Sequence, residues 1–304
     1  MNKYLLFITL LIFVHGLNGQ DLKPFEVTDE WLSDLHNIIP SSLTIKVNEK
    51  RNLLVFSLYT GFEHWTIPHT EAVLKELGNK FDNLNISSST DIKIFEKAQL
   101  KKYDAIILNN NCSIGPRRNL FLDVLDSNPD LNAKEKNTKA QKLERNLLEY
   151  VENGGGLMVL HGAVTMLNRS KDFSMLVGGS FDYHHKQQTI KIELVDAKHP
   201  MVKAFKGEGF EHVDEPYIFN NAYEDLDFKP LLSMNINKIE GVKEQAKNAT
   251  RYISWIKKYG KGRVFYCSPS HNPQSYKNPN LLQFLLDGMQ YVSGDLKCDD
   301  NPLK

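Results

Sequence analysis

Short apolar runs alternate with helical patterns along most of this chain. The runs at residues 53–58, 103–108 and 157–160 are continuous, which is typical of strands buried on both faces of a parallel sheet. Between the first two, residues 69–77 carry apolar side chains at helical spacing, and Gly78 ends that pattern. This order predicts an α/β fold: a doubly wound, mostly parallel sheet with helices on both faces.

Weaker patterns predict the remaining elements. Residues 92–95 predict a short second strand, and residues 128–142 predict a polar loop that leads into a helix at 143–151. From residue 189 to 194 apolar and polar positions alternate, which indicates a half-exposed strand. The last predicted elements are two strands and an amphipathic helix, at residues 251–256, 263–267 and 280–292.

The first residues follow a different pattern. Lys3 precedes an apolar run at residues 4–14, and the small residue Gly19 comes shortly after it. This order predicts a cleavable signal peptide, because a run of that length is too short to span a bilayer, which takes ~20 residues. A buried N-terminal strand or an uncleaved anchor is the alternative. The predicted divisions are a signal peptide at 1–19, a leader segment at 20–50, one α/β domain at 51–296 and a tail at 297–304.

Composition narrows the classes of function. The chain has 304 residues, with 37 Lys+Arg against 37 Asp+Glu, so it lacks the basic excess of a common nucleic-acid binder. No segment after the first run is long and apolar enough to predict a membrane span. Three cysteines cannot form a dense disulfide framework, and Cys112 and Cys267 end apolar runs as small buried residues do. We expect a secreted or periplasmic globular protein, with homo-oligomerisation left open.

Histidines follow several of the predicted strands. His64 comes after the first strand, His161 after the strand at 157–160, and His271 after the strand at 263–267, while His184 follows a glycine pair. The carboxyl ends of parallel strands meet at one edge of a sheet, so these imidazoles and the carboxylate of Glu215 are expected to lie close together. Imidazoles with a carboxylate suit a divalent metal, zinc first, or acid–base catalysis on hydroxyl groups.

The predicted metal ligands are His64, His161, His184 and His271. The sequence contains neither HExxH nor paired CxxC, so no spacing is a zinc signature by itself. Any one of these histidines could instead cap a helix or bind the backbone.

His161 carries the sharpest single signal. It ends a buried strand and is followed by Gly162 and Ala163, as in a nucleophile elbow, where small residues allow a tight turn that presents one side chain. A Ser or Cys at this position would predict covalent catalysis. The imidazole instead predicts a general base or a metal ligand.

Other side chains near the same strand ends are candidate substrate contacts. Trp65, Tyr183 and Tyr217 present ring faces that suit the C–H faces of a sugar, and Asn110 and His271 offer hydrogen bonds to hydroxyl groups. Each of these residues could equally belong to the core or satisfy loop backbone.

Taken in order, these pieces form a recognisable set. They are residues 61–65, 103–110, 154–163, 176–181 with His184, 199–200, 214–217 and 255–271. The set resembles the ThuA-like (trehalose utilisation) domain, a branch of the class I glutamine amidotransferase-like fold. The resemblance implies a flavodoxin-like sheet in which His161 replaces the amidotransferase cysteine, and a role in the catabolism of sugars or keto-glycosides. His185 departs from the family pattern, which commonly has Pro there, so His185 could replace or assist His184.

Two classes of function follow from these observations. The first is an exported enzyme acting on a small-molecule carbohydrate, a glycoside or keto-glycoside, with His161, Glu215, His64 and His184 as catalytic residues. Metal-assisted hydrolysis and proton abstraction beside a carbonyl both fit, so the class is hydrolase or lyase/isomerase. The alternative is a sugar-binding or accessory protein that retains the pocket without the chemistry.

Overall fold

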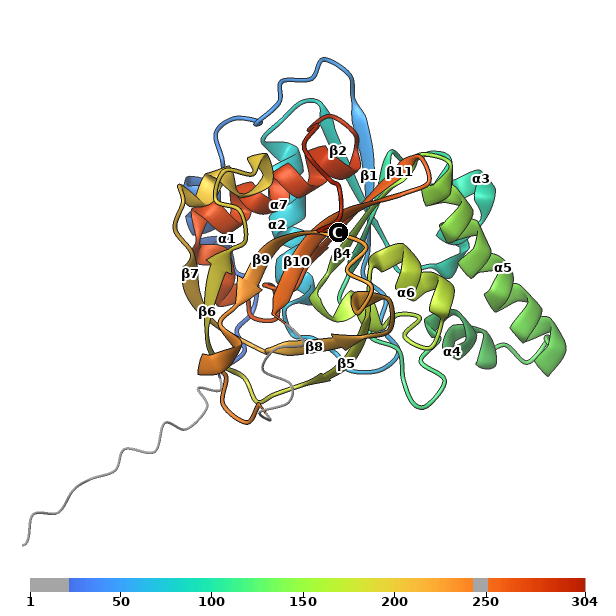
Figure 1. The fold of residues 1–304 in the computed structure, drawn as a ribbon. Coiled ribbons are helices and arrows are strands. Elements are labelled where there is room, and N and C mark those ends of the chain that lie inside the picture. The colour runs from blue at the N-terminus through green and yellow to red at the C-terminus, as the bar shows by residue number, and fades with distance from the viewer. Residues whose placement is uncertain (1–21, 243–250, 304) are drawn as a thin grey trace, which may run out of the picture.

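The computed structural model describes residues 22–242 and 251–303 (Figure 1). The predicted signal peptide at residues 1–19 lies outside the described residues. None of the helices in the described part of the chain combines the length and the apolarity that crossing a membrane requires.

A mixed sheet forms the centre of the molecule. Among the described residues, its strands follow the order β2-β1-β3-β4-β11-β10-β9-β6-β7. The parallel half consists of β1 (Arg51–Phe56), β2 (Leu84–Ser89), β3 (Ala105–Asn109), β4 (Gly156–Leu160) and β11 (Gly262–Cys267). The antiparallel extension consists of β10 (Tyr252–Tyr259), β9 (Lys229–Met234), β6 (Gln188–Leu194) and β7 (Phe210–Asp214). A separate pair, β5 (Ser180–His184) and β8 (Tyr217–Asn220), lies across the lower end of the sheet in Figure 1.

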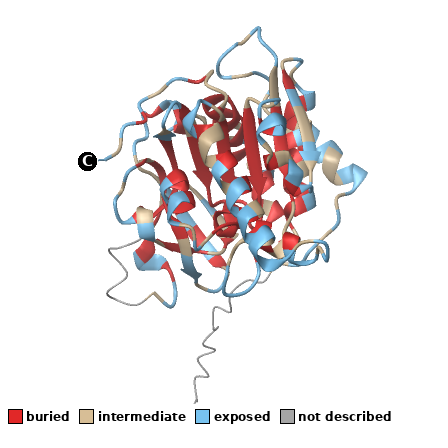
Figure 2. Ribbon diagram, turned by 90° about the vertical axis from the view of Figure 1, so that its right-hand side faces the viewer, coloured by how far each residue is buried: buried red, intermediate tan, exposed pale blue. Residues whose placement is uncertain are grey.

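Helices cover both faces of the parallel half, which confirms the predicted doubly wound α/β class. One face packs against α1 (Asp29–Ile38), α2 (Ile67–Asn79) and α7 (Pro279–Val292). The other packs against α3 (Lys97–Leu100), α4 (Leu120–Asp126), α5 (Ala133–Glu152) and α6 (Lys171–Val177). Side chains alternate between the two cores along each strand, so Ala105 and Ile107 enter one core while Ile106 and Leu108 enter the other. Figure 2 shows the strands buried between helices whose outer faces are exposed.

Short 3-10 helices connect several of these elements. They are η1 (Ile92–Phe95), η2 (His161–Thr165), η3 (Pro200–Phe205), η4 (Asn221–Tyr223), η5 (Ile236–Lys238) and η7 (Pro273–Lys277).

Two sequence predictions about elements were wrong. Residues 92–95 form η1 instead of a strand, because the Asp91 side chain accepts a hydrogen bond from the Lys93 amide and starts a helical turn. The second strand is β2, an edge strand whose polar sequence gave no apolar signal. The predicted loop at 128–142 also belongs in large part to α5, which begins with a capping box formed by Asn132 and Glu135.

The leader segment packs on α7 and covers its polar side chains. The predicted amphipathic helix is in fact buried nearly all round, including Asp287 and Gln290. The Thr44 hydroxyl donates a hydrogen bond to Asp287 (2.6 Å), and the Gln290 amide exchanges bonds with the backbone of Ile45 (3.1 and 2.6 Å). These bonds satisfy polar groups that would otherwise be costly to bury.

Asp287→Asn is expected to raise stability above pH 6. Burial raises the pKa of Asp287 from its ordinary 3.8 to about 6 despite its bonds to Thr44 and Gln283, so the folded protein loses stability as the pH rises between these two values. Asn keeps the acceptor oxygen without the charge, so the variant should gain on the order of 2–3 kcal/mol at neutral pH. Urea unfolding at pH 4 and pH 7.5 measures this. Asp130→Asn, on an exposed turn, is the control, and an equal gain there would contradict the assignment.

Candidate active site

Four strand ends bring four ionisable side chains together. His64 lies in the loop after β1, His161 directly follows β4, His271 lies after β11, and Glu215 lies between β7 and β8. One ligand atom from each residue lies within 4.8 Å of the other three. We call these four residues the His/Glu cluster. The three histidines are buried, and the Glu215 side chain is 14% exposed, so the carboxylate marks the solvent side of the cluster.

His161 has the backbone geometry expected of an elbow. Its φ of 44° lies in the left-handed region, which is rare for a residue other than glycine, and η2 begins there. The amide of Gly162 donates a hydrogen bond to Asn110 Oδ1 (3.2 Å), which fixes the turn. A β-carbon on Gly162 would lie 2.5 Å from His64 Cε1, so only glycine fits between the elbow and His64.

Hydrogen bonds define which nitrogen of His161 faces the cluster. Nδ1 lies 2.9 Å from the carbonyl oxygen of Ser268, and because a carbonyl only accepts, Nδ1 carries the hydrogen. Nε2 is therefore unprotonated in the neutral ring. It lies 3.2 Å from His271 Nδ1 and 3.5 Å from Glu215 Oε2. His271 Nδ1 lies 3.3 Å from the same carboxylate oxygen.

The environment keeps the rings of His64 and His271 neutral and the carboxylate of Glu215 charged. Burial lowers the pKa of His64 well below its ordinary value, and burial together with the neighbouring His161 lowers the pKa of His271 to about 3. Burial alone would raise the pKa of Glu215, but the ring of His161, and after it those of His271 and His184, favour the ionised carboxylate and lower its pKa. Neutral imidazole and ionised carboxylate are the forms that bind metals.

The His/Glu cluster fits a divalent cation. His64 Nε2 is buried without a hydrogen-bond partner, which leaves a lone pair with no protein donor. Three imidazole nitrogens and one carboxylate oxygen are also the donor types that zinc prefers, and the bond from His161 to the Ser268 carbonyl is the usual outer support of a ligating histidine.

The family model of ThuA, described as trehalose utilisation, matches residues 52–292. The chain belongs to the ThuA family. A search of curated protein sequences finds no match to it. The family description supports a carbohydrate-related role and confirms the resemblance seen in the sequence.

Two solved structures of ThuA-like proteins, and one of a protein described as cytoplasmic, share the fold. A putative ThuA-like protein from Bacteroides uniformis is 20% identical with a TM-score of 0.60, over 81% of this chain and 93% of that chain. A second, from Parabacteroides merdae, is 17% identical with a TM-score of 0.55, over 82% and 92%. A cytoplasmic protein from Salmonella typhimurium LT2 is 14% identical with a TM-score of 0.53, over 79% and 98%.

In this ThuA chain, three more of the predicted site residues border the His/Glu cluster. The Tyr217 ring lies 4.2 Å from the His161 ring and is buried. His184 lies at the end of β5, with Nδ1 3.7 Å from Glu215 Oε1 and 43% of its side chain exposed. His184 therefore lies at the solvent-exposed edge of the cluster. Glu215, instead of His184, is the fourth residue of the set whose atoms lie close enough together to hold a metal. Asn110 is buried, and its amide binds Gly162 and Asn109.

Two predicted substrate contacts lie farther out. The Trp65 ring packs against Phe25 of the leader segment (5.6 Å between centroids) and against His69 (5.8 Å). Tyr183 is 38% exposed, with its ring 5.3 Å from that of His185. The role of these two rings in substrate binding stays a prediction.

One side chain of the site, that of Cys112, was not among the site residues predicted from the sequence. Cys112 follows β3 and is buried, as expected, but its Sγ lies 3.6 Å from His64 Nδ1 and 3.4 Å from the Gly162 carbonyl oxygen. Burial raises the pKa of this thiol to about 11, so it stays protonated at neutral pH. The strand-end rule that selected the histidines applies equally to Cys112 and could have found it. All three cysteines, Cys112, Cys267 and Cys298, are free.

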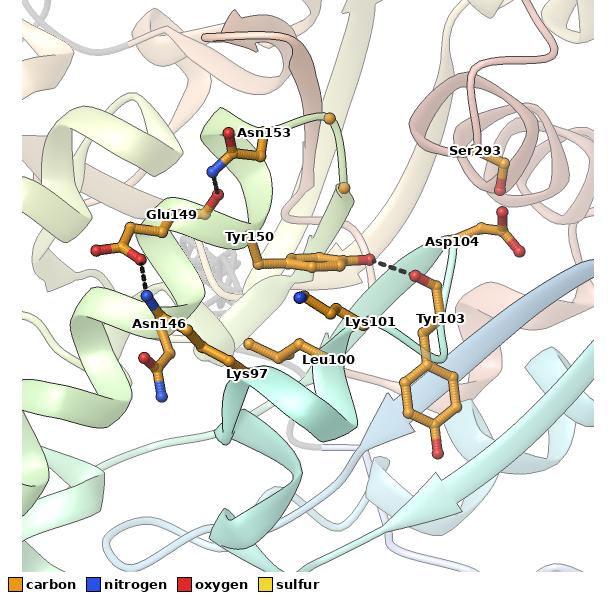
Figure 3. A pocket seen from close by; sticks show the side chains of 12 residues that line it. Lys97, Leu100, Lys101, Tyr103, Asp104, Asn146, Glu149, Tyr150, Asn153 and Ser293 are labelled. Carbon is orange, nitrogen blue, oxygen red and sulfur yellow. Dashed lines mark hydrogen bonds and ion pairs between the residues drawn. The ribbon is translucent and has the colours of Figure 1, made fainter.

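A pocket of about 580 Å³ lies at the opposite edge of the ThuA sheet (Figure 3). It opens between α3 and α5, where the Lys97 ammonium pairs with Glu149 (2.5 Å) and the Tyr150 hydroxyl donates to the Tyr103 carbonyl oxygen (3.1 Å). Lys97 and Lys101 are balanced by Glu149 and Asp104, and the pocket shares no residue with the His/Glu cluster. Its lining therefore favours no particular ligand charge.

Proposed function

We propose that this protein is an exported, metal-dependent enzyme of carbohydrate catabolism that acts on a glycoside or keto-glycoside. The observation that carries the proposal is the convergence of three imidazoles and one carboxylate at the carboxyl edge of the sheet. The family description supports the substrate class. The apolar run at residues 4–14 supports export to a secreted or periplasmic location.

Each residue has a distinct role in this proposal. His64, His161 and His271 would hold a divalent cation, zinc first, through imidazole nitrogens, which leaves one position for substrate, and the Glu215 carboxylate beside them would act as the base. Such a cation, when bound, acts as a Lewis acid toward a sugar carbonyl or hydroxyl. The Ser268 carbonyl keeps His161 Nε2 aimed at the cluster, and the buried Tyr217 ring fixes the plane of the imidazole.

Proton transfer falls to the solvent side of the cluster. Glu215 is ionised at neutral pH and partly exposed, so its carboxylate can accept a proton from a hydroxyl or from a carbon beside a carbonyl. His184 lies next to Glu215 Oε1 and reaches solvent, which suits it to exchange that proton with the leaving group or with water. Hydrolysis and lyase or isomerase chemistry would both use Glu215 and His184 in this way.

Metal content is the direct test of the proposal. Protein purified without chelator should carry about one equivalent of a divalent metal, because the cluster offers one site per chain. Turnover of a panel of glycosides and keto-glycosides should be lost after chelation and restored by Zn²⁺. Elemental analysis and product chromatography measure the two quantities. Full turnover by metal-free protein would remove the metal from the proposal, and binding without turnover at every metal loading would favour an accessory sugar-binding protein.

A further inference from the structure

The thiol of Cys112 is placed to determine which ring nitrogen of His64 carries the hydrogen. Cys112 Sγ lies 3.6 Å from His64 Nδ1 on one side and 3.4 Å from the Gly162 carbonyl oxygen on the other. A thiol has one hydrogen, and a carbonyl oxygen can only accept. With the thiol hydrogen directed to Gly162, the sulfur is left as an acceptor, so the contact with His64 requires a hydrogen on Nδ1.

The other ring nitrogen of His64 supports the same assignment. Nε2 is buried and has no hydrogen-bond partner. A hydrogen on Nε2 would therefore be a buried donor without an acceptor, which costs about 1–3 kcal/mol. A hydrogen on Nδ1 avoids this cost and satisfies both the thiol and the ring.

Crowding fixes the three groups relative to one another. An added β-carbon at Gly162 would lie 2.9 Å from Cys112 Sγ as well as 2.5 Å from His64 Cε1, so the thiol, the ring and the elbow are packed in direct contact. The Thr165 hydroxyl also donates to the Gly162 carbonyl oxygen (2.8 Å), which holds this acceptor in place.

We infer that Cys112 is a positioning residue that holds His64 in the Nδ1–H tautomer, with the bare Nε2 directed into the His/Glu cluster. Cys112 does for His64 what the Ser268 carbonyl does for His161, through a side chain instead of the backbone. Both rings then present Nε2 to the same point. The tautomer itself does not depend on the proposed function, whereas its value for metal binding does.

Long-range ¹H–¹⁵N correlation spectra test the tautomer directly, because protonated and bare ring nitrogens resonate far apart. The spectra are recorded on the full mature chain without added metal, and the His64 signals are assigned by their loss in His64→Gln. Wild type and Cys112→Ser, which keeps a donor and an acceptor, should show hydrogen on Nδ1 of His64. Cys112→Ala should lose that preference. Cys298→Ala, in the C-terminal tail, should match wild type.

A Co²⁺ titration of the same variants measures the consequence. Cys112→Ala should bind Co²⁺ about 10–100-fold more weakly than wild type, the usual effect of losing an outer partner of a ligand, and Cys112→Ser should recover most of the loss. Hydrogen on Nε2 of His64 in wild type, or an unchanged tautomer in Cys112→Ala, would overturn the inference. Absence of Co²⁺ binding by wild type with the expected tautomers would contradict the proposed metal site and leave the positioning role in place.

Discussion

His161→Asn is expected to abolish both metal binding and turnover while the protein stays folded. Asn tolerates the left-handed φ of 44° at this position better than Ala does, and its side-chain amide can still donate to the Ser268 carbonyl oxygen. What it lacks is an atom in the place of Nε2, which faces His271 and Glu215. We expect kcat/KM to fall by roughly 10³-fold or more, the range found for groups that act at the reacting centre.

Steady-state kinetics on the best glycoside of the panel, with circular dichroism and metal analysis, measure this effect. His36→Ala is the matched control, because His36 lies on α1 and is exposed. Retention of more than a tenth of the wild-type kcat/KM in His161→Asn would show that the elbow imidazole has no part in the reaction.

Gly162→Ala is expected to damage the site through space alone. The new methyl group would lie 2.5 Å from His64 Cε1 and 2.9 Å from Cys112 Sγ, closer than carbon atoms tolerate, so His64 must move away from the cluster. We expect a loss of stability on the order of 1–3 kcal/mol and a fall in Co²⁺ affinity of about 10²-fold.

Gly207→Ala separates the loss of stability from the loss of Co²⁺ affinity. Gly207 has a φ of +87° and no heavy atom near the position of an added β-carbon, so this variant carries backbone strain without a clash in the site. Its Co²⁺ affinity should equal that of wild type, and its unfolding temperature should fall. Equal metal affinity in Gly162→Ala and Gly207→Ala would show that the crowding around His64 has no functional role.

The buried strands and the gathering of the histidines could be predicted because both follow from local patterns. Strands such as β3 and β4 are continuous apolar runs, and parallel strands end at one edge, so His64, His161 and His271 had to lie near one another. The edge strand β2 could not be found in this way, since its LNISSS sequence is half exposed and lacks an apolar run.

Which side chains enter the site depends on distances in the folded protein, and no sequence pattern specifies these distances. Glu215 follows β7 and His184 ends β5, and only the packed structure places Glu215 inside the cluster and His184 at its exposed edge. The Ser268 carbonyl that orients His161 is a backbone atom, which any residue type would supply. The structure places the Asn110 amide, a predicted substrate contact, in the buried turn of the elbow, a position that no sequence pattern indicates.

The contact between the leader segment and α7 makes the folding of one end of the chain depend on the presence of the other. Thr44 and Asp287 are separated by 243 positions, and the bond between them closes only when the last helix is present. A chain that is made from its N-terminus must therefore keep the leader unpaired until nearly all of the sequence has followed. The leader segment is therefore the last part to pack on the core. The ThuA family match begins at residue 52, but a protein truncated there would lose the bonds that the leader makes to α7.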